Sequence, residues 1–183
     1  MTQRRRVKLD DSGLPVRKED VPEESVGPCD CPVLDPADWD HAESDWTDIT
    51  FVKAMTNAVL GVPVGYDKVR DELRARAEAL GATVPEDAML LNGSGKFRRP
   101  IMLEVEGARD GDGVVRPGGF VYTRLLDAPL GSLGKAVDST AQEARLRFGR
   151  KPDETWVWYL TCRECSRARN FETLVVAHYR ASR

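Results

Sequence analysis

The hydrophobic residues of the chain follow two kinds of spacing, and these alternate along it in a fixed order. Short runs of β-branched and aromatic residues predict strands, whereas apolar residues three or four positions apart predict amphipathic helices. In the first half the predicted elements are a strand at 49–55, a helix at 66–80, and strands at 89–91 and 101–106. In the second half they are a strand at 119–126, a helix at 133–148, and strands at 155–160 and 174–179. A glycine follows each helix, as is common where helices end.

The order strand, helix, strand, strand therefore occurs twice, and such a repeat constrains the whole fold. We expect an α+β domain, in which a largely antiparallel sheet carries its helices on one face. The run 59–63 is expected to continue the first strand past a bulge. Residues 1–28 are rich in charge and proline and predict a flexible leader, which leaves 29–183 as the folded domain. The acidic segment 35–48 is predicted to be a loop anchored by its two tryptophans.

Composition narrows the classes of function. The chain has 183 residues, of which 27 are Lys or Arg and 30 are Asp or Glu, so its net charge is −3 with histidine neutral. This balance argues against a nucleic-acid partner, because neutralising phosphates needs a net basic face. No apolar run of about 18 residues is present, and no apolar core follows the basic N-terminus, so we expect neither a membrane span nor a secretory signal, and a cytoplasmic location.

Several short segments resemble a known family. They are 29–32, 63–66, 102–105, 122–123 and 158–165. With the duplicated order, they resemble the GyrI-like small-molecule-binding domains, and in particular a stand-alone branch of hydrolases that open the cyclopropane ring of DNA-alkylating natural products of the yatakemycin type. The resemblance covers roughly residues 29–180. It implies a pocket between the halves, lined by aromatic side chains and holding a buried glutamate.

The strand at 155–160 carries the most distinctive candidate site. Side chains alternate between the two faces of a strand, so Trp156 and Trp158 share one face and Tyr159 points to the other. Two indoles on one face either belong to the core or form a flat wall that stacks a planar ligand. The other candidate ligand contacts, beside these, are Phe120, Tyr122, Tyr66, Phe97 and His178.

Glu104 lies in mid-strand, on the face opposite to Leu103 and Val105. That face either meets solvent or lines the cleft, where the carboxylate can act as a general base or as the counter-charge of a cationic ligand. The resemblance favours a hydrolase. In it Glu104 would activate water, Trp158 would stabilise developing positive charge, and Tyr122 would donate a hydrogen bond to the oxygen that gains electrons.

The leading hypothesis is therefore an enzyme that detoxifies planar DNA-alkylating agents by adding water, and so confers resistance. The alternative is a non-catalytic binder that senses or sequesters hydrophobic or cationic small molecules. A third hypothesis is an inhibitor that acts through a protein partner such as a topoisomerase. The expected partner of the first two is a small planar hydrophobic ligand.

The four cysteines form two short motifs, Cys29-x-Cys31 and Cys162-x-x-Cys165, about 130 residues apart. In a reducing compartment disulfides are disfavoured, so metal binding and thiol chemistry come into question. A C-x-x-C pair is an ordinary half of a tetrahedral zinc site, although the C-x-C half is less usual. We expect free thiols with no metal and no cofactor; structural zinc on all four sulfurs and a catalytic pair with His41 or His178 are the alternatives.

Overall fold

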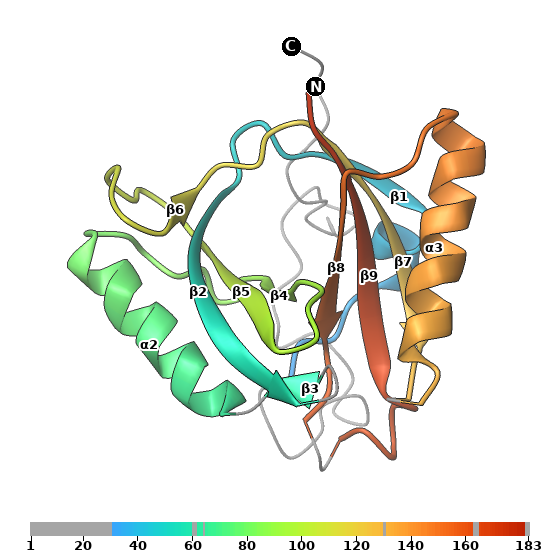
Figure 1. Ribbon diagram of the computed structural model, residues 1–183, viewed down its shortest axis with the longest axis horizontal. Helices are drawn as coiled ribbons and strands as arrows, with labels where there is room; N and C mark the ends of the chain where they lie inside the picture. The colour runs from blue at the N-terminus through green and yellow to red at the C-terminus, as the bar shows by residue number, and fades with distance from the viewer. Residues whose placement is uncertain (1–30, 60–61, 64, 130, 163–164, 182–183) are drawn as a thin grey trace, which may run out of the picture.

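A computed structural model of the chain describes residues 31–59, 62–63, 65–129, 131–162 and 165–181. This described part contains three helices and nine strands (Figure 1). The helices are α1 (Pro36–Trp39), α2 (Tyr66–Ala79) and α3 (Leu133–Phe148). The strands are β1 (Ala42–Asp45), β2 (Thr50–Val59), β3 (Val62–Pro63), β4 (Leu90–Asn92), β5 (Arg98–Val105), β6 (Val114–Val115), β7 (Phe120–Asp127), β8 (Glu154–Tyr159) and β9 (Glu172–Tyr179).

All of the strands belong to one antiparallel sheet with the order β1-β7-β9-β8-β4-β5-β2-β3, and β6 pairs with β2. In each half the first strand pairs with the third, and the third pairs with the second. Both halves therefore have the same strand order, β4-β5-β2 in the first and β8-β9-β7 in the second. Counted outward from the junction, these orders run in opposite directions across the sheet. They meet where β4 pairs with β8, through the single register pair Asn92↔Val157. The predicted α+β fold with a tandem repeat is confirmed.

The sheet curls, and both long helices lie on its outer, convex side (Figure 1). Helix α2 covers β2 and β5, where Leu73 and Ala77 pack on the alternate residues Ile101, Leu103 and Val105 of β5. Helix α3 covers β7, β9 and β8. This arrangement follows from the amphipathic pattern, because each helix buries one apolar stripe against the sheet.

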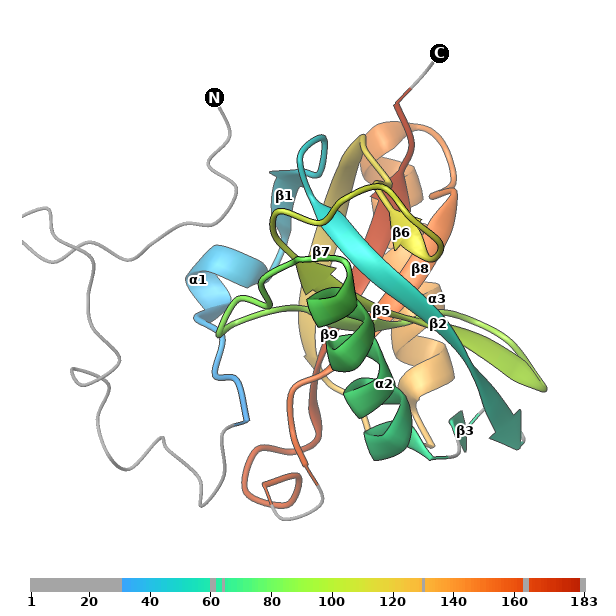
Figure 2. The same ribbon diagram turned by 90° about the vertical axis from the view of Figure 1, so that its left-hand side faces the viewer.

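The concave side of the sheet holds a second core, to which both halves contribute. Trp46, Phe51, Met102, Trp156 and Trp158 belong to it. Helix α1 covers one end of this core, because its Trp39 packs there. Figure 2 shows α1 beside β1, away from the two long helices. The indole of Trp39 in α1 meets that of Trp158 edge to face, with ring centroids 6.1 Å apart.

Three short elements differ from the sequence-based predictions. The segment expected to be a loop, 35–48, contains α1, capped by Asp35, and β1, which is paired along β7. These elements depend on a cap and on a distant strand, which hydrophobic spacing does not report. Val62–Pro63, which was expected to continue the first strand past a bulge, instead pairs antiparallel with the end of β2. The predicted leader, residues 1–28, lies outside the described residues. Within the described residues, no helix is long and apolar enough to cross a membrane.

Candidate functional site

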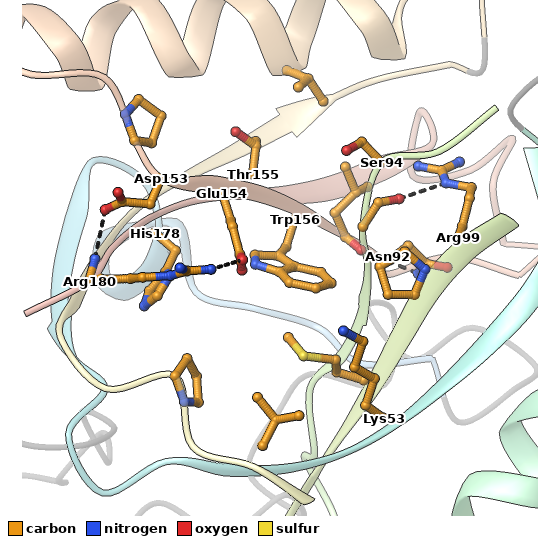
Figure 3. A pocket seen from close by; sticks show the side chains of 18 of the residues that line it. Lys53, Asn92, Ser94, Arg99, Asp153, Glu154, Thr155, Trp156, His178 and Arg180 are labelled. Carbon is orange, nitrogen blue, oxygen red and sulfur yellow. Dashed lines mark hydrogen bonds and ion pairs between the residues drawn. The ribbon is translucent and has the colours of Figure 1, made fainter. Parts of the chain in front are cut away.

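A cavity of about 730 Å³ opens on the concave side of the sheet, at the junction of the two halves. Residues of β2, β4 and β5 line it on one side, and residues of β8 and β9 line it on the other (Figure 3). Its volume falls in the range of about 300–1,000 Å³ that is usual for small-molecule sites. The predicted cleft between the halves is therefore present.

His178 of β9 lines this cavity and is buried, with 1% of its surface exposed. Its ring lies flat against Trp46, at a centroid distance of 5.7 Å, and its Nε2 is 2.8 Å from the carbonyl oxygen of Gly118. A carbonyl oxygen only accepts, so in the neutral ring Nε2 carries the proton and Nδ1 has a free lone pair. Nδ1 is buried and has no hydrogen-bond partner among the described residues.

Asn92 of β4 is the second buried polar group of the lining. Its Nδ2 donates to the carbonyl oxygen of Val157 at 3.3 Å and so ties β4 to β8 across the junction. Its Oδ1 is also buried without a partner in the part of the chain that the structure describes. Since buried polar atoms are rarely left unpaired, these two atoms of lining residues call for a partner such as bound water or a ligand.

Lys53 and Trp156 reach into the same cavity from opposite halves (Figure 3). Lys53 follows Phe51 on the concave face of β2, and Trp156 stands on the same face of β8. The indole fits closely over Gly93, where an added Cβ would lie 2.8 Å from Cζ3 of Trp156. A glycine is therefore needed beneath the ring, and the ring presents a flat apolar wall next to a flexible cation.

Further charged residues belong to the lining of the cavity. Arg180 forms an ion pair with Glu154, the residue opposite His178 in the β8–β9 register, and its backbone N–H donates to Asp153 at 2.9 Å. That backbone hydrogen bond lowers the pKa of Asp153, so this carboxyl group stays ionised. Among the described lining residues four side chains are cationic and two are acidic: Lys53, Arg99, Arg116 and Arg180 against Asp153 and Glu154. The cavity is therefore electropositive.

Two of the predicted ligand contacts, Trp156 and His178, line the cavity. Glu104 and Trp158 face the same concave side but lie deeper, outside the described lining. Glu104 is buried, and its Oε2 accepts a hydrogen bond from the backbone N–H of Met89 at 3.1 Å. Trp158 is covered by Trp39. The structure therefore gives both residues a place in the concave core rather than in the cavity wall.

The other predicted contacts lie elsewhere. Phe120 and Tyr122 face α3, where they pack near Phe148 on the convex side of the sheet. Tyr159 lies on the opposite face of β8 from Trp158, as the alternation predicts. Phe97 is exposed in the connection between β4 and β5. Tyr66 begins α2, and its side chain is outside what the structure describes.

Tyr122 instead belongs to a polar cluster beneath α3. Its hydroxyl donates to Oε1 of Glu143 at 2.6 Å and lies 2.8 Å from Nδ1 of His41. Arg124 bridges Glu143 and Asp40. Burial, and then the hydrogen bond to Glu143 and its charge, raise the pKa of Tyr122. Burial opposes ionisation of Glu143, but the bonds from Tyr122 and Arg124 outweigh it and lower the pKa of Glu143.

The sequence analysis missed Lys53, Asn92 and Glu154. A signal for Lys53 was present, because it is the one charge in the apolar run 49–55 and shares a strand face with Phe51. Asn92 looked like an ordinary turn residue. Glu154 gave no signal, because a charged residue at a strand end is typical of a solvated position.

The cysteines are separate from this cavity. Cys31, Cys162 and Cys165 lie together, with their Sγ atoms all within 4.8 Å of one another. None of these three residues lines the cavity. Cys29 lies outside the described residues.

The fold and the cavity define an α+β protein with a ligand-sized site between two repeated halves. A family model described as "Bacterial hydrolase" matches residues 22–178. The match covers most of the chain, so the chain belongs to this bacterial hydrolase family, and the name of the family indicates a hydrolase in general. A comparison with curated proteins finds no match. The resemblance to GyrI-like domains and to cyclopropyl hydrolases stays a prediction.

Proposed function

We propose that the protein hydrolyses a small molecule with a planar apolar part, bound in the concave cavity against Trp156. One observation carries the proposal: His178 lines the cavity, and its buried Nδ1 has no hydrogen-bond partner among the described residues. A histidine held by a carbonyl on one nitrogen and unpartnered on the other can act as a general base. Membership of a hydrolase family supports the same class of reaction.

In this proposal His178 accepts a proton from the attacking water. The Gly118 carbonyl and the ring of Trp46 hold the imidazole in one orientation, so Nδ1 needs no reorganisation to take the proton. The free Oδ1 of Asn92 accepts a hydrogen bond from the substrate or from the water. This assignment replaces the earlier expectation for Glu104, which is already bound to a backbone N–H.

Lys53 takes the role that was expected of Tyr122. As water adds to the electrophilic carbon, the bond to the leaving group breaks and its electrons move to an oxygen atom. The ammonium group of Lys53 stabilises that oxygen and can supply its proton, while His178 keeps the proton from water. Water is added in the net reaction, and no other reactant is needed.

The substrate class proposed for the first test is the cyclopropane-bearing DNA alkylators that the resemblance implies. These molecules are planar, which fits the flat wall of Trp156. Opening their strained ring moves electrons to a conjugated oxygen, which the ammonium group of Lys53 would stabilise. The excess of cationic side chains around the cavity favours an electron-rich ligand. It disfavours the cationic drugs that a sensing protein of this type would bind.

The test is to incubate the purified full chain with a cyclopropane-bearing alkylator and to look for the water adduct by mass spectrometry. We expect His178→Gln, which keeps a donor for Gly118, to slow turnover by about 10²–10⁴-fold. The matched control is His41→Gln, because His41 lies on the convex side. Lys53→Met is paired in the same way with Lys135→Met, an exposed lysine of α3.

The outcomes separate the hypotheses. Product formation that depends on His178 and Lys53 but not on their controls supports the proposal. Tight binding without product would favour a binding protein. Turnover that is equal in all four variants would remove both residues from the mechanism, and neither binding nor turnover would exclude this substrate class.

A further inference from the structure

Three cysteines from distant parts of the chain converge at one place. Cys31 precedes α1, whereas Cys162 and Cys165 lie in the connection between β8 and β9. Their sulfur atoms all lie within 4.8 Å of one another. Two segments that are 131 residues apart in the chain therefore present three sulfur atoms to a single point.

We infer that Cys31, Cys162 and Cys165 bind a zinc ion through their three sulfur atoms. Thiolates are soft ligands, and zinc is one of the ions that such ligands select. At a zinc–sulfur distance of about 2.3 Å, the sulfur atoms of a tetrahedral site are about 3.8 Å apart. The observed cluster therefore has to contract by about 1 Å at most. A disulfide would use only two of the three sulfur atoms, whereas an ion uses all of them.

The burial of the three residues suits the entry and the retention of an ion. Cys165 is buried, Cys31 is half-buried and Cys162 is exposed. An ion can therefore reach the cluster from solvent on the side of Cys162. The backbone N–H of Cys162 also donates to Sγ of Cys31 at 3.1 Å. This bond stabilises the thiolate over the thiol, as the outer-shell partners of metal ligands do.

Arg169 brings the two segments together by contacts that need no metal. Its side chain donates to the carbonyl oxygen of Pro32, the neighbour of Cys31, at 2.7 Å. Its backbone N–H donates to the carbonyl oxygen of Cys165 at 3.0 Å. The same guanidinium group forms an ion pair with Glu172 at the start of β9. The three sulfur atoms are therefore brought together before an ion binds, which lowers the entropy cost of binding.

The bound ion joins the segment before α1 to the connection between β8 and β9, whatever its further ligand is. Metal links that close long loops restrict the unfolded chain most in theory, and the two segments are 131 residues apart. The joined segment continues into Leu34 and Trp39, which pack on the concave core, and Trp39 covers Trp158 there. Zinc should therefore raise the stability of the folded chain.

The first measurement is the zinc content of the full chain, purified without chelators, by elemental mass spectrometry. We expect about one zinc ion per chain. Cys31→Ser and Cys162→Ser should each weaken zinc binding by at least about 10-fold in competition with a chromogenic chelator, because even the loss of an outer-shell partner costs that much. Arg167→Ser is the control, since Arg167 is exposed in the same connection and offers no sulfur.

Three results would overturn the inference. One is a chain that neither holds zinc nor takes it up. Another is an unchanged zinc affinity in either serine variant, which would remove that sulfur from the site. The third is copper in place of zinc in the purified chain, which would overturn the assignment of the ion.

Cobalt(II) gives a second measurement on the natural chain, which does not depend on a variant that folds. Titration of the metal-free full chain should produce a thiolate-to-cobalt charge-transfer band, which zinc then displaces. The absence of this band, or a disulfide between any two of the three cysteines in the purified chain, would contradict the site.

Urea unfolding tests the link between the two segments. Zinc should raise the urea midpoint of the metal-free natural chain but not that of Cys162→Ser, because a ligand that binds only the folded state stabilises it. A midpoint that zinc leaves unchanged in the natural chain would contradict the link. None of these measurements uses turnover, so their outcome is independent of the proposed hydrolysis.

Discussion

Replacing Tyr122 with phenylalanine tests the polar cluster under α3. The change keeps the ring, which packs on Phe148, and removes only the hydroxyl that donates to Glu143 at 2.6 Å. A hydrogen bond to a charged group contributes about 1.5–3 kcal/mol to stability. With an m-value of about 2–3 kcal/mol/M, the urea midpoint at pH 7 should fall by about 0.5–1.5 M.

The same variant predicts a dependence on pH. The pKa of Glu143 is lowered in the folded state, so its contribution to stability is complete above the unfolded value and is lost as the pH falls through the folded pKa. Tyr122→Phe removes one cause of the lowered pKa, although Arg124 stays. We therefore expect the difference in unfolding free energy between the natural chain and the variant to shrink below about pH 4.5.

Tyr179→Phe is the matched control. Tyr179 is equally buried on the same face of the sheet, but its hydroxyl donates to the neutral carbonyl oxygen of Arg150 at 3.2 Å. Its loss should cost about 0.5–1.5 kcal/mol and should not depend on pH. Equal losses in the two variants at pH 7, with no change in acid, would refute the argument that the charge of Glu143 strengthens the bond of Tyr122.

Three further substitutions, the first with a control, test the core and the cavity by urea unfolding and by assays of ligand binding and turnover. Gly93→Ala would place a Cβ 2.8 Å from Trp156, so we expect the unfolding free energy to fall by about 1–3 kcal/mol and the ligand to bind more weakly. The control Gly134→Ala, in open space on α3, should raise the unfolding free energy by about 0.5–1 kcal/mol. Leu73→Ala should cost about 2–5 kcal/mol, because Leu73 of α2 is fully buried against the sheet; a smaller loss would mean that this core repacks easily. Asn92→Ala should cost about 1–3 kcal/mol and should also reduce turnover; unchanged kcat and KM would remove its side chain from the site.

The spacing of hydrophobic residues along the chain was sufficient to predict the two long helices and most of the longer strands. Helix spacing and strand alternation act over a few residues, so they predicted α2 and α3 and the side of β5 that α2 covers. The cleft between the halves was predicted from the resemblance to the GyrI-like domains. What the pattern lacked were the elements that depend on distant partners, such as β1, which is held along β7.

The site was predicted only in part, and β7 shows why. One face of this strand carries Phe120 and Tyr122, and the other carries Val121 and Thr123, all of them largely buried. A strand covered on both sides has no polar face to mark which side is open. The sequence could therefore not tell that Tyr122 lies under α3. On β8 the pair of tryptophans was correctly placed on one face, but only the position of α1 decides that Trp156 lines the cavity and Trp158 does not.

The position of the cavity follows from the way the halves are joined. Within each half the first and third strands pair over eight register positions, whereas the halves meet through one, Asn92↔Val157. Both long helices occupy the convex side, so neither of them fills the concave side of a sheet that bends at this junction. A space there has to be filled by side chains from both halves or by a ligand. Because Lys53 comes from one half and His178 from the other, the proposed site exists only when the two halves are correctly aligned.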